Sequence, residues 1–111
     1  RKRPSLIRPL AYDPPIILMD EPFGAVDAQT RGQLQQDLLR LWNHGRKTII
    51  FVTHDIDEAI ALGDRVLVLS RSPAKVIAEH RVEIARPRDL GNLYKLDGFG
   101  DMFEAVRQQI Q

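Results

Sequence analysis

Two carboxylates and one imidazole follow two apolar runs of the sequence. Asp20 and Glu21 come directly after the run Ile16–Met19, and His54 lies shortly after the run Ile49–Val52. One carboxylate can hold Mg²⁺ directly or through water, a second can deprotonate an attacking water molecule, and an imidazole can hydrogen-bond a terminal phosphate. These residue types therefore indicate transfer of a phosphoryl group to water. Adjacent residues at a strand end point to opposite sides, so the two carboxylates have different roles.

The apolar runs themselves predict the strands of an α/β fold. The runs 16–19, 49–52 and 66–69 are continuous rather than alternating, and segments with helical periodicity separate them. This pattern is typical of parallel βαβ units whose strands are covered on both faces. Because such crossovers are right-handed and return the chain in the same direction, the first two strands end at the same edge of the sheet. The two carboxylates and the imidazole are therefore expected to converge at that edge.

A helix is predicted between the first two strands, and a shorter helix follows the second strand. In the first helix Asp27 can cap the start, Gly45 suits the end, and the apolar residues fall on one face. Those apolar residues are Leu34, Leu38, Leu41 and Trp42. The second helix is predicted over Ile56–Leu62, with Asp55 and Glu58 as capping residues rather than catalytic groups.

The pattern of the sequence changes after the third strand. A turn cluster at Arg71–Ala74 precedes a stretch with mostly apolar residues at every second position up to Ile84, which predicts a hairpin or meander. The glycine-containing segment 90–100 is expected to be a loop. A terminal helix is predicted near Asp101, which forms a capping pair with Glu104. The predicted fold class is α/β, with a parallel βαβαβ core, a C-terminal hairpin and a C-terminal helix.

Length, composition and charge limit the class of protein. The chain has 111 residues, of which 43% are hydrophobic, enough for the core of one domain but too short for two. Lys and Arg number 16 against 15 Asp and Glu, so the net charge of +1 argues against nucleic acid as a partner. The absence of cysteine excludes disulfides and thiolate chemistry, and no apolar run approaches the ~20 residues of a membrane span. The chain is therefore expected in the cytoplasm.

Three motifs, in this order and at this spacing, resemble those of a known family. The run Ile17–Phe23 resembles the Walker B motif, Gly24–Asp27 the D-loop, and Thr53–Ala59 the switch histidine region of ATP-binding cassette (ABC) transporter ATPase subunits. The resemblance implies that the chain has part of the P-loop NTPase fold of that family. It also implies that the complete domain binds ATP and Mg²⁺.

The resemblance further implies roles for four residues. Asp20 would serve Mg²⁺, directly or through water, and Glu21 would be the catalytic base. His54 would contact the γ-phosphate, and Asp27 would lie in the loop that meets the second subunit of an ATPase dimer. Glu21 and His54 are thus the predicted catalytic residues. Asp20 and Asp27 are the predicted cofactor-binding residues, with Asp20 as the metal ligand.

The resemblance covers nearly the whole chain but only the later part of the family's domain. Residues 1–111 are therefore expected to be the C-terminal portion of one nucleotide-binding domain. The sequence contains no G-x-x-x-x-G-K-[ST] phosphate loop, no Q-loop and no LSGGQ-type signature. Residues 3–11 look like the helix that follows the signature, in which Pro9 disfavours an uninterrupted helix. In the family the phosphate-loop strand belongs to the same central sheet, so its absence predicts unpaired strand edges and a chain prone to association.

Partners, location and solute class are also implied by the resemblance. An ABC importer implies a second ATPase subunit, transmembrane permease subunits and, indirectly, a periplasmic or lipid-anchored solute-binding protein. Its ATPase would lie in the cytoplasm, peripheral to the inner face of the cell membrane. The segments 64–70 and 82–88 look most like those of the importer ATPases for nitrate, sulfonates and taurine.

Two functions of different class stay open on the sequence alone. The first is the ATP-hydrolysing subunit of an ABC importer, of which this chain carries the hydrolytic edge without being active by itself. The second is a truncated, inactive chain that acts at most as an interaction module. An in-frame phosphate-loop motif upstream of Arg1 would favour the first function.

Overall fold

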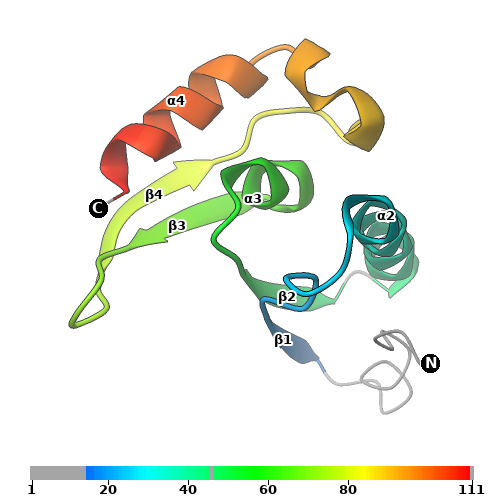
Figure 1. Ribbon diagram of the computed structural model, residues 1–111, viewed down its shortest axis with the longest axis horizontal. Coiled ribbons are helices and arrows are strands. Elements are labelled where there is room, and N and C mark those ends of the chain that lie inside the picture. Colours follow the sequence, from blue (N-terminus) through cyan, green and yellow to red (C-terminus); the bar gives the residue numbers. More distant parts are fainter. Residues whose placement is uncertain (1–14, 46, 111) are drawn as a thin grey trace. The chain divides into compact units, whose positions relative to one another are not determined.

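The first of two units of the chain contains a parallel pair of strands (Figure 1). The computed structural model describes residues 15–45 and 47–110, so the helix expected within residues 3–11 lies outside the described residues. The two units are residues 1–54 and 55–111. All four predicted site residues belong to the first unit.

In the first unit, β1 (Ile16–Asp20) and β2 (Thr48–Val52) run parallel and are linked through α2 (Ala28–Gly45). The chain leaves β1, forms the helix and returns in the same direction, as a βαβ unit does. Buried apolar side chains come from the strand, from the turn after it and from the helix. They are Ile17, Met19, Phe23, Leu34 and Leu38.

One face of this parallel pair is exposed. Along β1, Ile17 and Met19 are buried, whereas Ile16 and Leu18 are 59% and 68% exposed. Ile50, in register with Leu18, is 52% exposed. The prediction that these strands are covered on both faces is therefore wrong for the described residues. An apolar run shows only that both faces of a strand can be buried. Among the described residues a packing partner is present for one face only.

The exposed face and the strand edges predict that the chain associates with itself in solution. Each sheet has two strands, so among the described residues every strand has one edge without a backbone partner. The exposed apolar side chains at Leu18 and Ile50 add a hydrophobic contribution to such contacts. We expect the sedimentation-derived mass to rise with concentration, and Leu18→Lys to reduce that rise while Gln36→Lys, on an exposed part of α2, leaves it unchanged. A monomer at all concentrations with a sharply cooperative melt would contradict this prediction.

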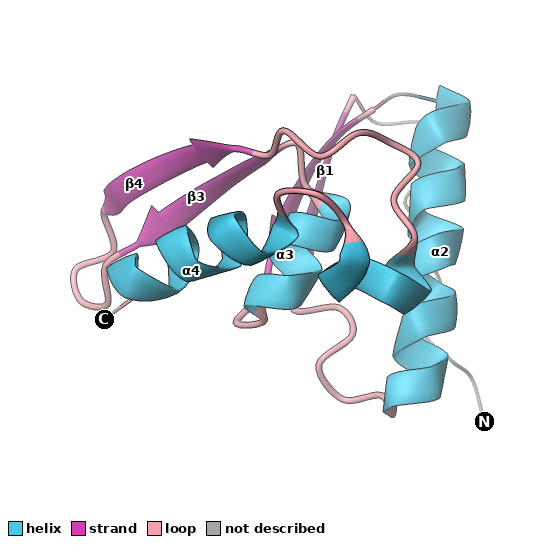
Figure 2. Ribbon diagram, turned by 90° about the horizontal axis from the view of Figure 1, so that it is seen from above, coloured by secondary structure: helices cyan, strands magenta, loops and turns pink. Residues whose placement is uncertain are grey.

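The second unit has an antiparallel pair of strands and three helical segments (Figure 2). It begins with α3 (Ile56–Leu62), followed by β3 (Arg65–Leu69) and β4 (Val76–Arg81). A short 3-10 helix, η1 (Leu90–Lys95), and α4 (Phe99–Gln109) complete it. In both views α4 lies alongside the β3–β4 pair. The core of this unit consists of Ile60, Val66, Val68, Val82, Ile84, Phe99 and Val106.

The third predicted strand pairs differently from the expectation. β3 is antiparallel to β4 and, within the described part of the chain, does not extend the parallel sheet. Residues 70–75 connect β3 directly to β4, so an antiparallel neighbour is available through a short connection. A place in the parallel sheet depends instead on strands far away in the sequence, whose pairing carries a larger loop-closure cost.

The C-terminal helix begins earlier than the capping pattern predicts. α4 starts at Phe99 after Gly98, whose φ of 87° favours glycine, and Asp101 lies inside the first turn. Glu104 is hydrogen-bonded by Arg107 instead of completing a cap. Phe99 is 1% exposed, so burial of its ring in the core outweighs the capping preference of the sequence. The segment expected to be a loop also contains η1.

A buried arginine closes the C-terminal end of α3. Arg88 is only 7% exposed. Its guanidinium donates to four main-chain carbonyl oxygens, those of Ile60 (2.9 Å), Ala61 (3.4 Å), Gly63 (2.7 Å) and Ile84 (3.0 Å). Burial, together with the nearby Arg86, lowers the pKa of Arg88 to about 10, so the group stays charged at neutral pH. The last carbonyls of a helix lack intrahelical donors, and Arg88 satisfies them without solvent.

Candidate functional site

Glu21 and His54 lie in contact at one edge of the β1–β2 pair. Glu21 directly follows β1, and His54 lies just past the end of β2. The Nε2 atom of His54 is 3.0 Å from Oε2 of Glu21, and the two side chains are 87% and 43% exposed. The parallel strands therefore bring these two residues together, as the sequence predicts. Both side chains are accessible to a ligand from solvent, while their catalytic roles stay predictions.

Asp20 precedes Glu21, but no contact joins its side chain to the Glu21–His54 pair among the described residues, so the contact expected of three residues is observed for two. It is the last residue of β1 and is exposed on the same strand face as Ile16 and Leu18. Its carboxylate makes no ion pair with any residue that the structure describes. The predicted role of Asp20 as the Mg²⁺ ligand stays a prediction.

The backbone of Glu21 is in the left-handed region. Its φ is 45°, a value that costs a residue with a side chain about 1–2 kcal/mol. The Glu21 amide donates to the carbonyl oxygen of Val52 at 2.7 Å, which ties the start of the turn to the end of β2. Non-glycine residues held in such conformations cluster at functional sites, where surrounding contacts fix them.

Asp27 is the N-cap of α2, as predicted. Its Oδ1 accepts a hydrogen bond from the Thr30 amide at 2.8 Å, and its Oδ2 accepts one from the Thr30 hydroxyl at 3.2 Å. The hydrogen bond from the backbone of Thr30, reinforced by the hydroxyl, lowers the pKa of Asp27 below its usual value. The carboxylate is therefore ionised at neutral pH. Its predicted place at a subunit contact is not tested by these contacts.

Replacing Asp27 with alanine is expected to destabilise the first unit, because the free amides at the start of α2 lose their acceptor. The melting midpoint should fall by about 5 °C at pH 7. The capping contribution is present above the unfolded-state pKa of 3.8 and is lost as pH falls through the lower folded-state pKa. Thermal melts of wild type and Asp27→Ala should therefore begin to converge as the pH falls below 3.8 and should meet only below the folded-state pKa. Asp27→Asn, which keeps an acceptor but no charge, is the control, and equal melts for all three proteins at pH 7 would contradict the cap.

Asp55, the first carboxylate after His54, caps the following helix. Oδ1 of Asp55 accepts a hydrogen bond from the Glu58 amide at 3.3 Å and so caps α3. Glu58 is 5% exposed within the second unit. The interpretation of Asp55 as a capping residue is confirmed by this bond.

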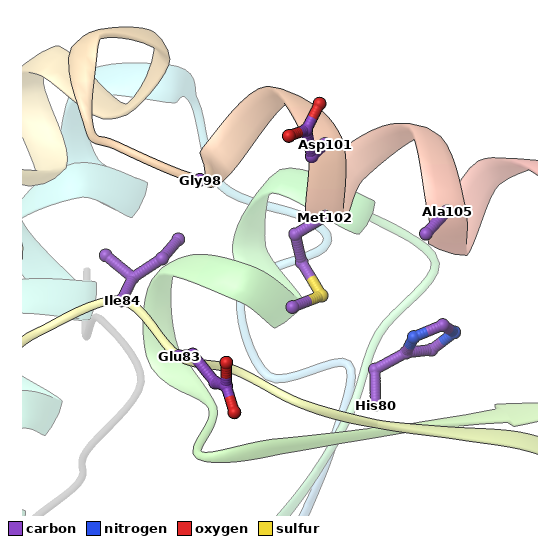
Figure 3. Close-up of a pocket in the computed structure, with 7 residues that line it drawn as sticks. All are labelled: His80, Glu83, Ile84, Gly98, Asp101, Met102 and Ala105. Carbon is purple, nitrogen blue, oxygen red and sulfur yellow. The ribbon is translucent and has the colours of Figure 1, made fainter.

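The second unit contains a hollow whose lining includes the polar side chains of His80, Glu83 and Asp101 (Figure 3). Its volume is 360 Å³, and it lies between α4 and the end of β4. Met102 points from α4 toward the strand, whereas the carboxylate of Asp101 points away. Within the described ranges no three histidine or acidic side chains are grouped to hold a metal ion. None of the described helices is long and apolar enough to cross a membrane.

Two residues that shape the structure are not found by sequence reasoning. Phe23, in the turn after Glu21, is 1% exposed, and its ring centroid lies 5.6 Å from that of Phe51 in β2. An aromatic residue inside a segment of turn residues could have signalled it. Arg88 carries no such signal, because a carbonyl-binding arginine looks like any surface cation in a sequence.

Comparison with known proteins identifies relatives along most of the chain. An uncharacterized ABC transporter ATP-binding protein of Methanocaldococcus jannaschii is 49% identical over 89 residues, which cover 80% of this chain and 33% of that protein. The bicarbonate transport ATP-binding protein CmpD of Synechocystis is 44% identical over 80% of this chain and 32% of its own length. The taurine import ATP-binding protein TauB of Ruegeria pomeroyi is 41% identical over 99% of this chain and 42% of its own length. Aliphatic sulfonates and nitrate import ATP-binding proteins match as well.

No family model matches the chain. The relatives nevertheless agree in their description and are between 41% and 49% identical to this chain in the three comparisons above. The chain spans 32% to 42% of the length of these relatives. This chain is similar in sequence to ATP-binding proteins of ABC transporters and spans less than half of the length of the relatives named above.

Proposed function

We propose that this chain is the hydrolytic portion of the ATP-binding subunit of an ABC importer. The observation that carries the proposal is the 3.0 Å contact between Glu21 and His54 at the end of two parallel strands. The Walker B, D-loop and switch histidine motifs lie in the unit that makes this contact or immediately follow it. The relatives named above are ATP-binding proteins of transport systems. The resemblance of the three motifs adds the reaction class to the proposal, namely ATP hydrolysis coupled to transport.

Glu21 is the general base in this proposal. An exposed carboxylate at 43% accessibility can accept a proton from a water molecule that attacks the γ-phosphate of ATP. His54 holds the carboxylate through Nε2 and can donate a hydrogen bond to a phosphate oxygen when that contact opens. The left-handed backbone at Glu21 fixes the direction in which its side chain leaves the main chain.

The residues at the strand end fit a Mg²⁺ ion bound together with ATP. Mg²⁺ is held by one or two carboxylates plus substrate phosphates, and Asp20 offers one carboxylate that no described cation neutralises. When bound, the ion neutralises charge on the phosphates of the nucleotide. In this proposal Asp20 binds the ion and so orients the nucleotide, while the adjacent Glu21 accepts the proton of the attacking water. This division follows from their different positions at the end of β1.

Other parts of the site come from outside this chain. The sequence has no phosphate-loop motif, so nucleotide binding depends on residues that the longer relatives carry beyond the matched segment. We assign residues 1–111 to the C-terminal portion of the nucleotide-binding domain, with the phosphate-loop strand completing the parallel sheet. Asp27 then meets a second ATPase subunit while it caps α2.

In this proposal the ATPase acts at the inner face of the cell membrane with permease subunits, and a solute-binding protein acts on the permease from the other side. The relatives named for taurine, aliphatic sulfonates, nitrate and bicarbonate point to small solutes with an oxyanion group as the transported class. Nitrate, sulfonates and taurine are the solutes that the sequence resemblance favours.

Expression of the reading frame that encodes this chain, with the residues that precede it, tests the proposal. The protein should bind Mg-ATP, and Asp20→Asn should weaken Mg²⁺-dependent binding at least about 10-fold because a carboxylate near the metal is lost. Asp101→Asn, an exposed carboxylate of the second unit, is the matched control and should leave affinity unchanged. A folded protein without measurable Mg-ATP binding would overturn the proposal and favour an inactive interaction module.

A further inference from the structure

The turn that follows β1 is anchored by one buried ring. Phe23 is 1% exposed, although its neighbours Gly24 and Ala25 are exposed. Its ring lies 5.6 Å from that of Phe51 at an interplanar angle of 53°. Aromatic pairs at such separations contribute beyond the area that they bury. A buried side chain in an otherwise exposed turn is a fixed point for the residues on either side.

The same turn imposes the left-handed backbone on Glu21. Among the described residues no other non-glycine residue has a positive φ. Two backbone hydrogen bonds bracket the residue, from its amide to the carbonyl oxygen of Val52 (2.7 Å) and from the Gly24 amide to its carbonyl oxygen (3.3 Å). The second is long, so hydrogen bonding alone holds the turn weakly on that side. Burial of Phe23 supplies the remaining constraint.

The ring pair also connects the two halves of the catalytic contact. Phe51 lies in β2, and His54 follows the end of this strand by two residues, whereas Phe23 lies two residues after Glu21. Packing of one ring on the other therefore fixes the turn that bears the carboxylate against the strand that bears the imidazole.

We propose that Phe23 is a positioning residue for Glu21, holding its carboxylate against His54. The catalytic consequence rests on the proposed function, whereas the positioning itself is a property of this chain. Without the ring, the turn loses its buried anchor and Glu21 relaxes to an ordinary negative φ. The carboxylate then leaves the imidazole, while Asp20, inside the strand, stays in place.

The imidazole ¹⁵N resonances of the 111-residue chain test the positioning. Glu21→Gln sets the size of the Nε2 shift change that loss of the charged partner produces at His54. Phe23→Ala should give a change of at least half that size. Leu38→Ala, at a 4% exposed position of α2, is the matched control and should leave the His54 resonance unchanged. The resonance of His44, also in α2, should be the same in every variant. The backbone amide of Glu21 should also exchange faster relative to the strand amides only in the Phe23 variant.

Several results would overturn the proposal. One is an equal His54 shift in Leu38→Ala and Phe23→Ala, which reports general destabilisation. Another is an unchanged His54 resonance in Phe23→Ala, and a third is an unchanged His54 resonance in Glu21→Gln. If Phe23→Ala unfolds, Phe23→Leu takes its place, with the same direction expected, and an unchanged His54 resonance in that folded variant also contradicts positioning.

Hydrolysis distinguishes this proposal from the proposed function. The protein to assay is the one expressed from the reading frame of this chain with the residues that precede it. In that protein Phe23→Leu should lower kcat by up to about 100-fold, because the catalytic group is displaced, and should leave Mg-ATP affinity unchanged. Unchanged kcat together with the expected His54 shift would remove the base role of Glu21 and leave the positioning intact. Unchanged kcat without that shift would overturn the positioning.

Discussion

Glu21→Gln is expected to reduce the turnover of ATP by about 10²–10⁴-fold, the usual contribution of a general base, in the protein expressed from the reading frame of this chain with the residues that precede it. Glutamine has the same shape and can still contact His54, whose Nε2 lies 3.0 Å from the carboxylate in the wild type. Its amide cannot accept a proton from water at neutral pH, so only the chemical step is removed. Mg-ATP affinity should stay close to that of the wild type, because Asp20 is unchanged.

Single-turnover hydrolysis and equilibrium binding of Mg-ATP measure these two effects separately. Glu79→Gln is the matched control, since Glu79 is an exposed carboxylate that pairs with Arg65 far along the chain from the site. It should leave both quantities unchanged. Wild-type turnover in Glu21→Gln would exclude Glu21 as the base, whereas equal loss of binding and turnover would assign it to the metal.

Arg88→Met is expected to lower the free energy of unfolding of the second unit by about 3 kcal/mol, because each buried acceptor left without a donor costs about 1–3 kcal/mol. In the wild type the guanidinium is 7% exposed and serves the carbonyls at the end of α3. Methionine fills much of the same volume but donates nothing. The loss therefore measures hydrogen bonding more than packing.

Urea unfolding followed by the amide resonances of α3 and β3 measures this loss in the second unit. Arg88→Lys keeps the charge but reaches fewer carbonyls, so it should fall between the wild type and Arg88→Met. Arg107→Met changes an exposed arginine that pairs with Glu104 in the same helix and should leave the midpoint nearly unchanged. Equal midpoints for the Arg88 and Arg107 variants would show that water satisfies the carbonyls equally well.

The local elements of this chain follow from residues that act within a few positions of one another. Asp27 and Asp55 accept amide hydrogen bonds from residues three positions ahead, so the starts of α2 and α3 are visible in the sequence. The end of α3 at Gly63 has a different cause, because its φ is −87° and a Cβ there would lie 2.8 Å from the carbonyl oxygen of Ala59. The beginning of α4 escapes this reasoning, because the burial of Phe99 decides it and burial depends on residues distant in the sequence.

The sequence by itself determined the order of strands and helices, the pairing of an acidic strand end with a histidine, and the family resemblance. These depend on residue type and spacing, which local geometry converts directly into position. Only the tertiary structure decided that β3 pairs with β4, that one face of the β1–β2 pair is exposed, and that Phe23 and Arg88 are buried. The physical reason is that strand pairing and burial depend on competition among segments far apart in the chain. The residues of one segment therefore do not determine which segment it packs against.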